Sequence, residues 1–145
     1  RINDGMGKHT AERTVKMLIR AGKQVRGARV AILGITFKED VPDLRNTKVV
    51  DIIRELQDFG VDVLVSDPLA NPDEALKYYG VDLQPLNQIK DIYAVILAVM
   101  HRVYREEGLQ VIAMLCDDRN ALVIDVKGCF SPEEAQKLGV VYWRL

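Results

Sequence analysis

Short, nearly continuous apolar runs alternate along this chain with stretches whose apolar residues recur at helical spacing. Continuous apolar runs are typical of strands that are buried on both faces of a sheet. The runs predict strands over 29–35, 61–65, 92–100, 122–126 and 140–143, and a short one over 81–83. The helical stretches are 6–21, 49–59, 73–79, 109–116 and 131–138, several of them ended by glycine. Strands separated by helices indicate βαβ units with right-handed crossovers, and therefore a parallel sheet.

The pattern predicts a single α/β domain, a Rossmann-like, doubly wound parallel sheet with a leading helix. The chain has 145 residues, 48% of them hydrophobic, which is enough for a real core. No apolar run approaches the roughly 18–20 residues of a membrane span, so we expect no membrane segment. Twenty basic residues against 21 acidic ones leave no basic face for nucleic acid. We expect Cys116 and Cys129 to be two buried thiols of a cytoplasmic protein, and no metal site.

Ligands of such sheets bind beyond the carboxyl ends of the strands, where the strand order reverses. This places the expected site among the loops 34–46, 99–105 and 125–130. The first loop holds one glycine, Gly34, where the dinucleotide fingerprint GxGxxG needs three. We interpret Asp67 as a turn residue before Pro68. His101 follows the central strand, and we expect it to be a hydrogen-bonding residue rather than a general base.

Candidate ligand contacts lie in the same loops. Lys38 and Arg45 can pair with phosphate, and Phe37 can pack on a sugar or a base. Lys127 emerges from the predicted strand end at Asp125, facing the same crevice. The residues alone leave an alternative open, in which Phe37 enters the core and the charges are solvated.

The run Gly34-Ile-Thr-Phe-Lys-Glu-Asp-Val-Pro-Asp-Leu-Arg-Asn-Thr47 resembles the signature of the C-terminal, UDP-binding domain of the UDP-glucose/GDP-mannose dehydrogenase family. The resemblance covers essentially the whole chain. Ser66-Asp67-Pro68 is similar to the family's Y/S-D-P turn, His101 falls in its T-x-H/W region, and Asp125-Val126-Lys127 is similar to its D-x-[RK] element. Residues 2–6 resemble the end of the central domain. On this basis we expect 1–22 to be the end of an inter-domain helix and 23–145 to be the UDP-sugar-binding domain.

The resemblance implies an NAD-dependent oxidoreductase that oxidises C6 of a nucleotide-sugar twice, to a carboxylate. It places Phe37, Lys38 and Lys127 on the UDP-sugar substrate and Arg45 on NAD, which the missing N-terminal domain would mainly hold. The catalytic cysteine and its helpers lie upstream in the family, so we expect this chain to carry no catalytic residue and to be inactive alone. Its partners would be its own N-terminal and central domains and, as a full-length enzyme, a second copy.

Leu44-Arg45-Asn46-Thr47 and the lysine at position 127 are closer to the branch that acts on UDP-N-acetylhexosamines. A UDP-glucose 6-dehydrogenase stays open as the alternative, as does a domain that mainly supports assembly without a ligand site of its own. A free-standing nucleotide sensor is a third possibility. Because the first residue is Arg1, we expect a fragment of a longer chain. Polysaccharide biosynthesis is the implied setting.

Overall fold

The computed structural model describes residues 5–117 and 120–145. Within them, five strands and five α-helices alternate as the apolar pattern predicts. The strands are β1 (Arg29–Leu33), β2 (Asp62–Ser66), β3 (Ala94–Leu97), β4 (Leu122–Asp125) and β5 (Val141–Arg144). The helices are α1 (Met6–Arg20), α2 (Val49–Asp58), α3 (Pro72–Tyr79), α4 (Arg102–Ala113) and α5 (Pro132–Leu138), with a 3₁₀ turn at Leu86–Gln88.

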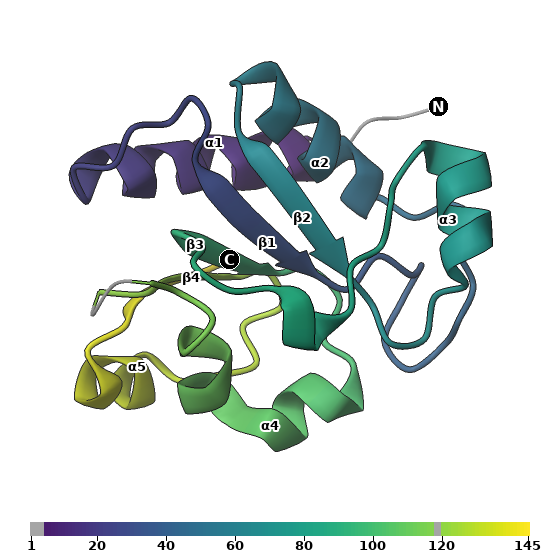
Figure 1. Ribbon diagram of the computed structural model, residues 1–145. Coiled ribbons are helices and arrows are strands. Elements are labelled where there is room, and N and C mark those ends of the chain that lie inside the picture. The colour runs from purple at the N-terminus through teal and green to yellow at the C-terminus, as the bar shows by residue number, and fades with distance from the viewer. Residues whose placement is uncertain (1–4, 118–119) are drawn as a thin grey trace.

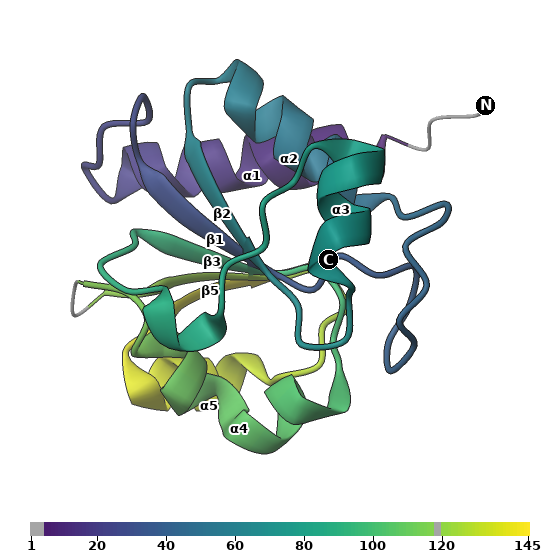
Figure 2. The ribbon, with the colours of Figure 1, turned by 45° about the vertical axis from the view of Figure 1, so that its right-hand side comes forward.

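The strands form one parallel sheet in the order β2-β1-β3-β4-β5. Helices α1 and α2 cover one face and α4 and α5 cover the other, so that the sheet lies between two helical layers (Figure 1). Helix α3 lies at the side of the strand arrowheads rather than over a face (Figure 2). The prediction of a doubly wound α/β domain with a leading helix is confirmed.

The leading helix is part of the core rather than an appendage. Ala11 and Leu18 are fully buried and pack in one apolar cluster with Ile52 of α2, Ile96 of β3 and Ile124 of β4. Residues 6–20 thus form a layer of the same fold as the strands. The division of the chain into 1–22 and 23–145 stays a prediction, and Ile2, Asn3 and Asp4 of its first segment lie outside the described residues.

Two element predictions need correction. The helix expected over 109–116 begins earlier, at Arg102, because the Asp40 carboxylate accepts a hydrogen bond from the Arg102 N–H and caps it from a distant loop. It is also broken at Gly108, which has φ 87°. The strand expected over 81–83 is reduced to one parallel bridge, between Leu83 and Val65. No helix in the described ranges is long and apolar enough to cross a membrane.

Candidate functional site at the switch point of the sheet

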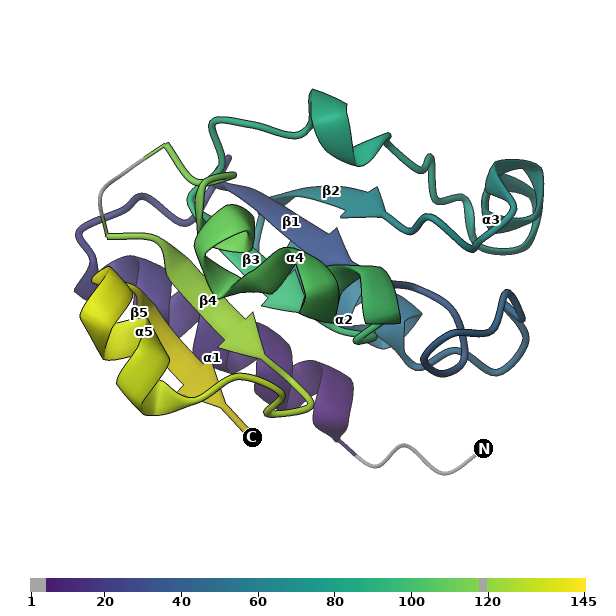
Figure 3. The same ribbon diagram turned by 90° about the horizontal axis from the view of Figure 1, so that it is seen from below.

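The loops that follow β1, β3 and β4 meet at one edge of the sheet. Strand β1 lies between β2 and β3. The chain therefore adds β2 on one side of β1 and then crosses to add β3 on the other side. This is the switch point at which doubly wound sheets bind ligands. In Figure 3 the loop after β1 extends beyond the strand arrowheads, and the start of α4 lies at the same end. The fold therefore has a switch point at the loops where the sequence placed the site.

A cavity of about 260 Å³ opens at this edge. Its apolar wall comes from both helical and strand-end residues and includes Met6, Val49, Ile52, Val99 and Val126. Phe37 also lines it and is 51% exposed, so this ring is outside the core. Charged residues complete the lining: Lys38, Lys48 and Lys127 with Glu39. Three cations beside one acid give the cavity a net positive rim that suits an anionic ligand with an apolar part.

Lys127 stands on a loop that the end of β4 holds rigidly. The fully buried Asp125 accepts hydrogen bonds from the N–H groups of Gly128 and Phe130, both at 3.0 Å. The Tyr142 hydroxyl also contacts this carboxylate, and burial together with that contact raises the pKa of the phenol. Lys127 itself is exposed and lines the cavity. The Asp-Val-Lys element thus combines a buried anchor with an outward cation.

A second buried carboxylate, Asp67 at the end of β2, organises the loop that carries Lys38. Its oxygens accept five hydrogen bonds, from N–H groups of Ile35, Thr36, Leu69 and Ala70 and from Nε2 of His101. Burial alone raises the pKa of Asp67, but the bonds from His101 and the backbone outweigh it and hold the pKa below its ordinary value. Asp67 therefore does more than form the turn that its sequence context predicted.

The His101 imidazole lies between the ends of three strands. It is 1% exposed, with Nε2 at 2.9 Å from Asp67 Oδ2 and 3.3 Å from Thr36 Oγ1. Its other nitrogen, Nδ1, accepts a hydrogen bond of 3.0 Å from the Asp40 N–H. A backbone N–H can only donate, so Nδ1 is the acceptor and Nε2 carries the proton. His101 is thus a hydrogen-bonding residue, as we predicted, and it reaches the Lys38 loop directly.

Arg45 lies on the same loop but outside the cavity. Its side chain is 82% exposed, and its Nε and Nη2 each donate to the Asp43 carboxylate at 3.1 Å. This pairing lowers the pKa of Asp43 and raises that of Arg45. The structure therefore brings Phe37, Lys38 and Lys127 together at one cavity and leaves Arg45 facing away from it.

The single glycine of the loop is needed for the close approach of two strand ends. Gly34 has φ +93°, a conformation that side chains with a Cβ rarely adopt. A Cβ at this position would lie 2.5 Å from the Val99 carbonyl oxygen and 2.6 Å from the Val99 Cβ. Val99 also lines the cavity. Gly34 thus allows the loops after β1 and β3 to touch where the cavity forms.

We expect Gly34→Ala to lower the free energy of unfolding by about 2 kcal/mol, because overpacking against Val99 adds to the cost of the left-handed backbone. Gly22→Ala is the matched control, since Gly22 has φ +76° and a Cβ there would meet nothing within 4 Å. Urea denaturation of both variants separates the two costs. Equal losses for the two variants would contradict the steric role of Gly34.

Other features of the described residues do not compete with this site. A larger groove of about 490 Å³ runs along the edge strand β2, but its charged residues are mixed in sign: Arg29, Arg54, Asp62 and Asp82. No group of three His, Cys, Asp or Glu side chains in the described ranges could hold a metal ion. The expectation of two buried thiols is wrong: Cys116 is half-buried and Cys129 is exposed.

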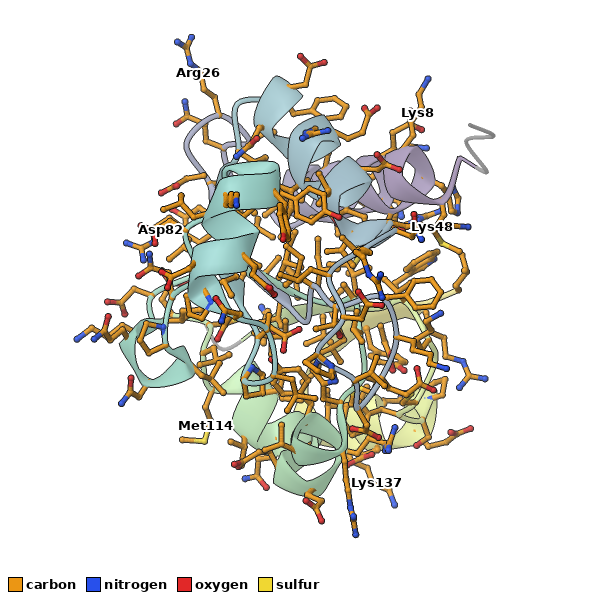
Figure 4. All side chains as sticks on the ribbon, turned by 90° about the vertical axis from the view of Figure 1, so that its right-hand side faces the viewer. Lys8, Arg26, Lys48, Asp82, Met114 and Lys137 are labelled. Carbon is orange, nitrogen blue, oxygen red and sulfur yellow. The ribbon has the colours of Figure 1, made fainter. Side chains whose placement is uncertain are left out.

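Sequence reasoning named the aromatic ring and two of the lysines at the cavity but missed the rest of its lining. Met6 and Ile52 were not candidates because they belong to helices α1 and α2, and Lys48 was not one because it precedes α2 as its N-cap residue, beyond the loop 34–46. Their position follows from the packing of the two helices at Gly7, where a Cβ would lie 2.6 Å from the Asp51 Cβ. Figure 4 shows Lys48 near the end of α1 that carries Lys8, and Lys137 at the far side of the molecule.

The fold and the cavity define a class, a Rossmann-like domain that has a cavity lined by side chains at the switch point of its sheet and no glycine-rich loop. The model of the UDP-glucose/GDP-mannose dehydrogenase family, UDP binding domain, matches residues 31–132. The chain belongs to this family. The expected resemblance is therefore confirmed.

Individual relatives are similar along most of the chain. Protein CapL of Staphylococcus aureus is 42% identical over 148 residues, which cover 100% of this chain and 34% of CapL. A UDP-N-acetyl-D-glucosamine 6-dehydrogenase of Pseudomonas aeruginosa is 41% identical over 115 residues, 79% of this chain and 27% of that protein. The crystal structure of NDP-N-acetyl-D-galactosaminuronic acid dehydrogenase from Methanosarcina mazei Go1 superposes with a TM-score of 0.86 at 28% identity, over 98% of this chain and 29% of that one. The chain thus spans about a third of the length of these relatives.

Proposed function

We propose that this chain is the nucleotide-sugar-binding C-terminal domain of an NAD-dependent UDP-sugar 6-dehydrogenase, acting on a UDP-N-acetylhexosamine. The observation that carries the proposal is the cavity at the switch point, where Lys38 and Lys127 from two different loops stand beside the exposed ring of Phe37. A UDP-sugar has a base with flat aromatic faces and a diphosphate with two negative charges, which match these two kinds of lining. The N-acetylhexosamine branch is supported by the names of the relatives that match this chain at 41% and 28% identity.

In this proposal each site residue has one role. Lys38 and Lys127 offset the charge of the diphosphate, and Phe37 packs on the uridine or the sugar. Arg45 reaches the NAD that the preceding domain holds; its exposed guanidinium, fixed outward by Asp43, supports this assignment. The chain supplies one wall of the active-site cleft and no catalytic residue. In this proposal the segment 1–22 is the end of the inter-domain helix that leads from the central domain into this one. The full-length enzyme forms a homo-oligomer and serves polysaccharide biosynthesis in the cytoplasm.

The test is a titration of the 145-residue chain with UDP, followed by backbone amide NMR shifts, with NAD⁺ as a comparison ligand. We expect shifts at residues 37–40 and 126–128, even at millimolar affinity, which corresponds to about 4 kcal/mol. NAD⁺ is expected to leave these amides unchanged.

Lys38→Ala is expected to weaken UDP binding at least about tenfold, because a charged hydrogen bond contributes about 1.5–3 kcal/mol. The change leaves the fold intact, since Lys38 is exposed. Lys137→Ala on α5 is the matched control and should bind UDP like the wild type. A wild-type spectrum unchanged by UDP would favour the assembly role instead, and an unchanged affinity of Lys38→Ala would remove Lys38 from the site.

A further inference from the structure

The segment that carries Lys38 is held from both sides by hydrogen bonds that do not involve the cavity. On one side the Thr36 hydroxyl donates to the Lys38 carbonyl oxygen at 3.0 Å. On the other, the Asp40 N–H donates to His101 Nδ1 at 3.0 Å. Lys38 itself is exposed and has its side chain at the cavity. The position of Lys38 is therefore set by groups behind it.

His101 connects this segment to the sheet. Its Nε2 lies 2.9 Å from Asp67 Oδ2, and Asp67 is fixed in turn by the N–H groups of Leu69 and Ala70. The imidazole is buried and does not line the cavity. It therefore connects the anchor at the end of β2 to the long loop that bears Lys38, and it does not itself line the cavity.

The backbone of the loop gives this contact particular weight. Asp40 has φ 64°, a left-handed conformation that costs free energy in a non-glycine residue. Such a conformation persists only where neighbours fix it. The Asp40 N–H is fixed by His101 Nδ1, and the Asp40 carboxylate is fixed by the Arg102 N–H at 2.7 Å. Losing the first of these bonds leaves the loop attached to α4 but free to change its turn at Asp40.

We propose that His101 is a positioning residue for Lys38: its Nδ1 holds the 37–40 turn in the conformation that aims Lys38 at the cavity. This deepens the proposed function and rests on it, because the ligand that Lys38 meets is the UDP of that proposal. The two nitrogens of His101 have separate tasks, Nε2 in the buried anchor and Nδ1 in the placement of the loop.

Two substitutions separate these tasks. In His101→Gln the terminal amide NH₂ can take the place of Nε2 and donate to Asp67, but the position of Nδ1 no longer holds an acceptor for the Asp40 N–H. In His101→Asn the amide oxygen can take the place of Nδ1 and accept from Asp40, but the donor to Asp67 is lost. If His101 were only structural, the variant that loses more stability would also lose more affinity for UDP. The positioning role predicts the opposite: His101→Asn loses more stability, and His101→Gln loses more affinity.

The first readout needs no ligand: amide hydrogen exchange of Asp40, compared with that of the core amide of Ile96 in the same sample. We expect His101→Gln to accelerate exchange at Asp40 about tenfold, the effect of one hydrogen bond, and to leave Ile96 unchanged. In His101→Asn the free energy of unfolding should fall, so that the Ile96 amide exchanges faster. The Asp40 amide should keep the protection that its own hydrogen bond provides. Should His101→Asn not fold, His101→Gln against the wild type still decides the point.

The second readout is the UDP titration. We expect about a tenfold weaker Kd for His101→Gln and a wild-type Kd for His101→Asn. Two results would overturn the role of His101 while leaving the proposed function in place. One is that the Asp40 amide of His101→Gln is as protected from exchange as in the wild type. The other is that the wild type binds UDP and His101→Gln binds it with the same Kd. If the wild type shows no UDP response, the proposed function fails, and the exchange result alone supports or overturns the positioning role.

Discussion

Asp67→Ala is expected to lower the free energy of unfolding by about 4 kcal/mol, because it leaves several buried donors without an acceptor. The carboxylate is fully buried as a side chain and accepts four backbone N–H groups besides His101. Its loss would free the ends of β1 and β2 at the same time. Urea denaturation measures the effect. Asp82→Ala, at an exposed acid that lines the groove along β2, should stay within about 0.5 kcal/mol of the wild type.

The same carboxylate makes part of the stability depend on pH. The folded pKa of Asp67 lies below its ordinary value, so its contribution is complete above the unfolded pKa of about 3.9. The contribution is lost as the pH falls through the lower, folded value. Asp67→Asn has no carboxyl group to titrate at this position. The difference in the free energy of unfolding between the wild type and this variant should therefore become smaller below about pH 4. A difference that stays constant down to acid unfolding would mean that folding does not shift the pKa of Asp67.

The strands could be predicted from the local pattern, because buried parallel strands are nearly continuous apolar runs. The position of the site could then be predicted from the carboxyl ends of those strands. The Ser131 helix start was equally local: its hydroxyl accepts from the Glu134 N–H at 3.1 Å. Lys38 and Lys127 were identifiable because they follow strand ends, and the carboxyl ends of parallel strands share one edge of the sheet. The family signature added specificity to both.

What local pattern missed depends on partners far apart in the chain. The early start of α4 requires Asp40, 62 residues before Arg102. The structural weight of Asp67 comes from donors more than 30 residues away on either side. None of these pairs has a periodicity or spacing that the sequence displays, because tertiary contacts alone bring them together.

Replacing both cavity lysines, Lys38 and Lys127, by methionine is expected to weaken UDP binding by more than about 100-fold, because two charged hydrogen bonds are lost together. Methionine keeps an apolar stem of similar length, so packing at the cavity rim changes little. The two residues come from loops after different strands, β1 and β4, and each loop has its own buried anchor. The fold should therefore be unaffected. The measurement is the UDP titration by NMR, with Lys77 and Lys137 replaced by methionine as the control.

Uridine separates charge from shape in this experiment. It has the base and ribose of UDP but no phosphate, so the lysine replacements should leave its weak affinity unchanged. The double variant should then bind UDP no better than it binds uridine. The single variants define a double-mutant cycle: a loss in the double variant smaller than the sum of the two single losses would mean that both lysines contact the same phosphate. If instead the wild type binds uridine as tightly as UDP, the positive rim does not hold the diphosphate, and the cavity recognises its ligand through Phe37 and the apolar wall.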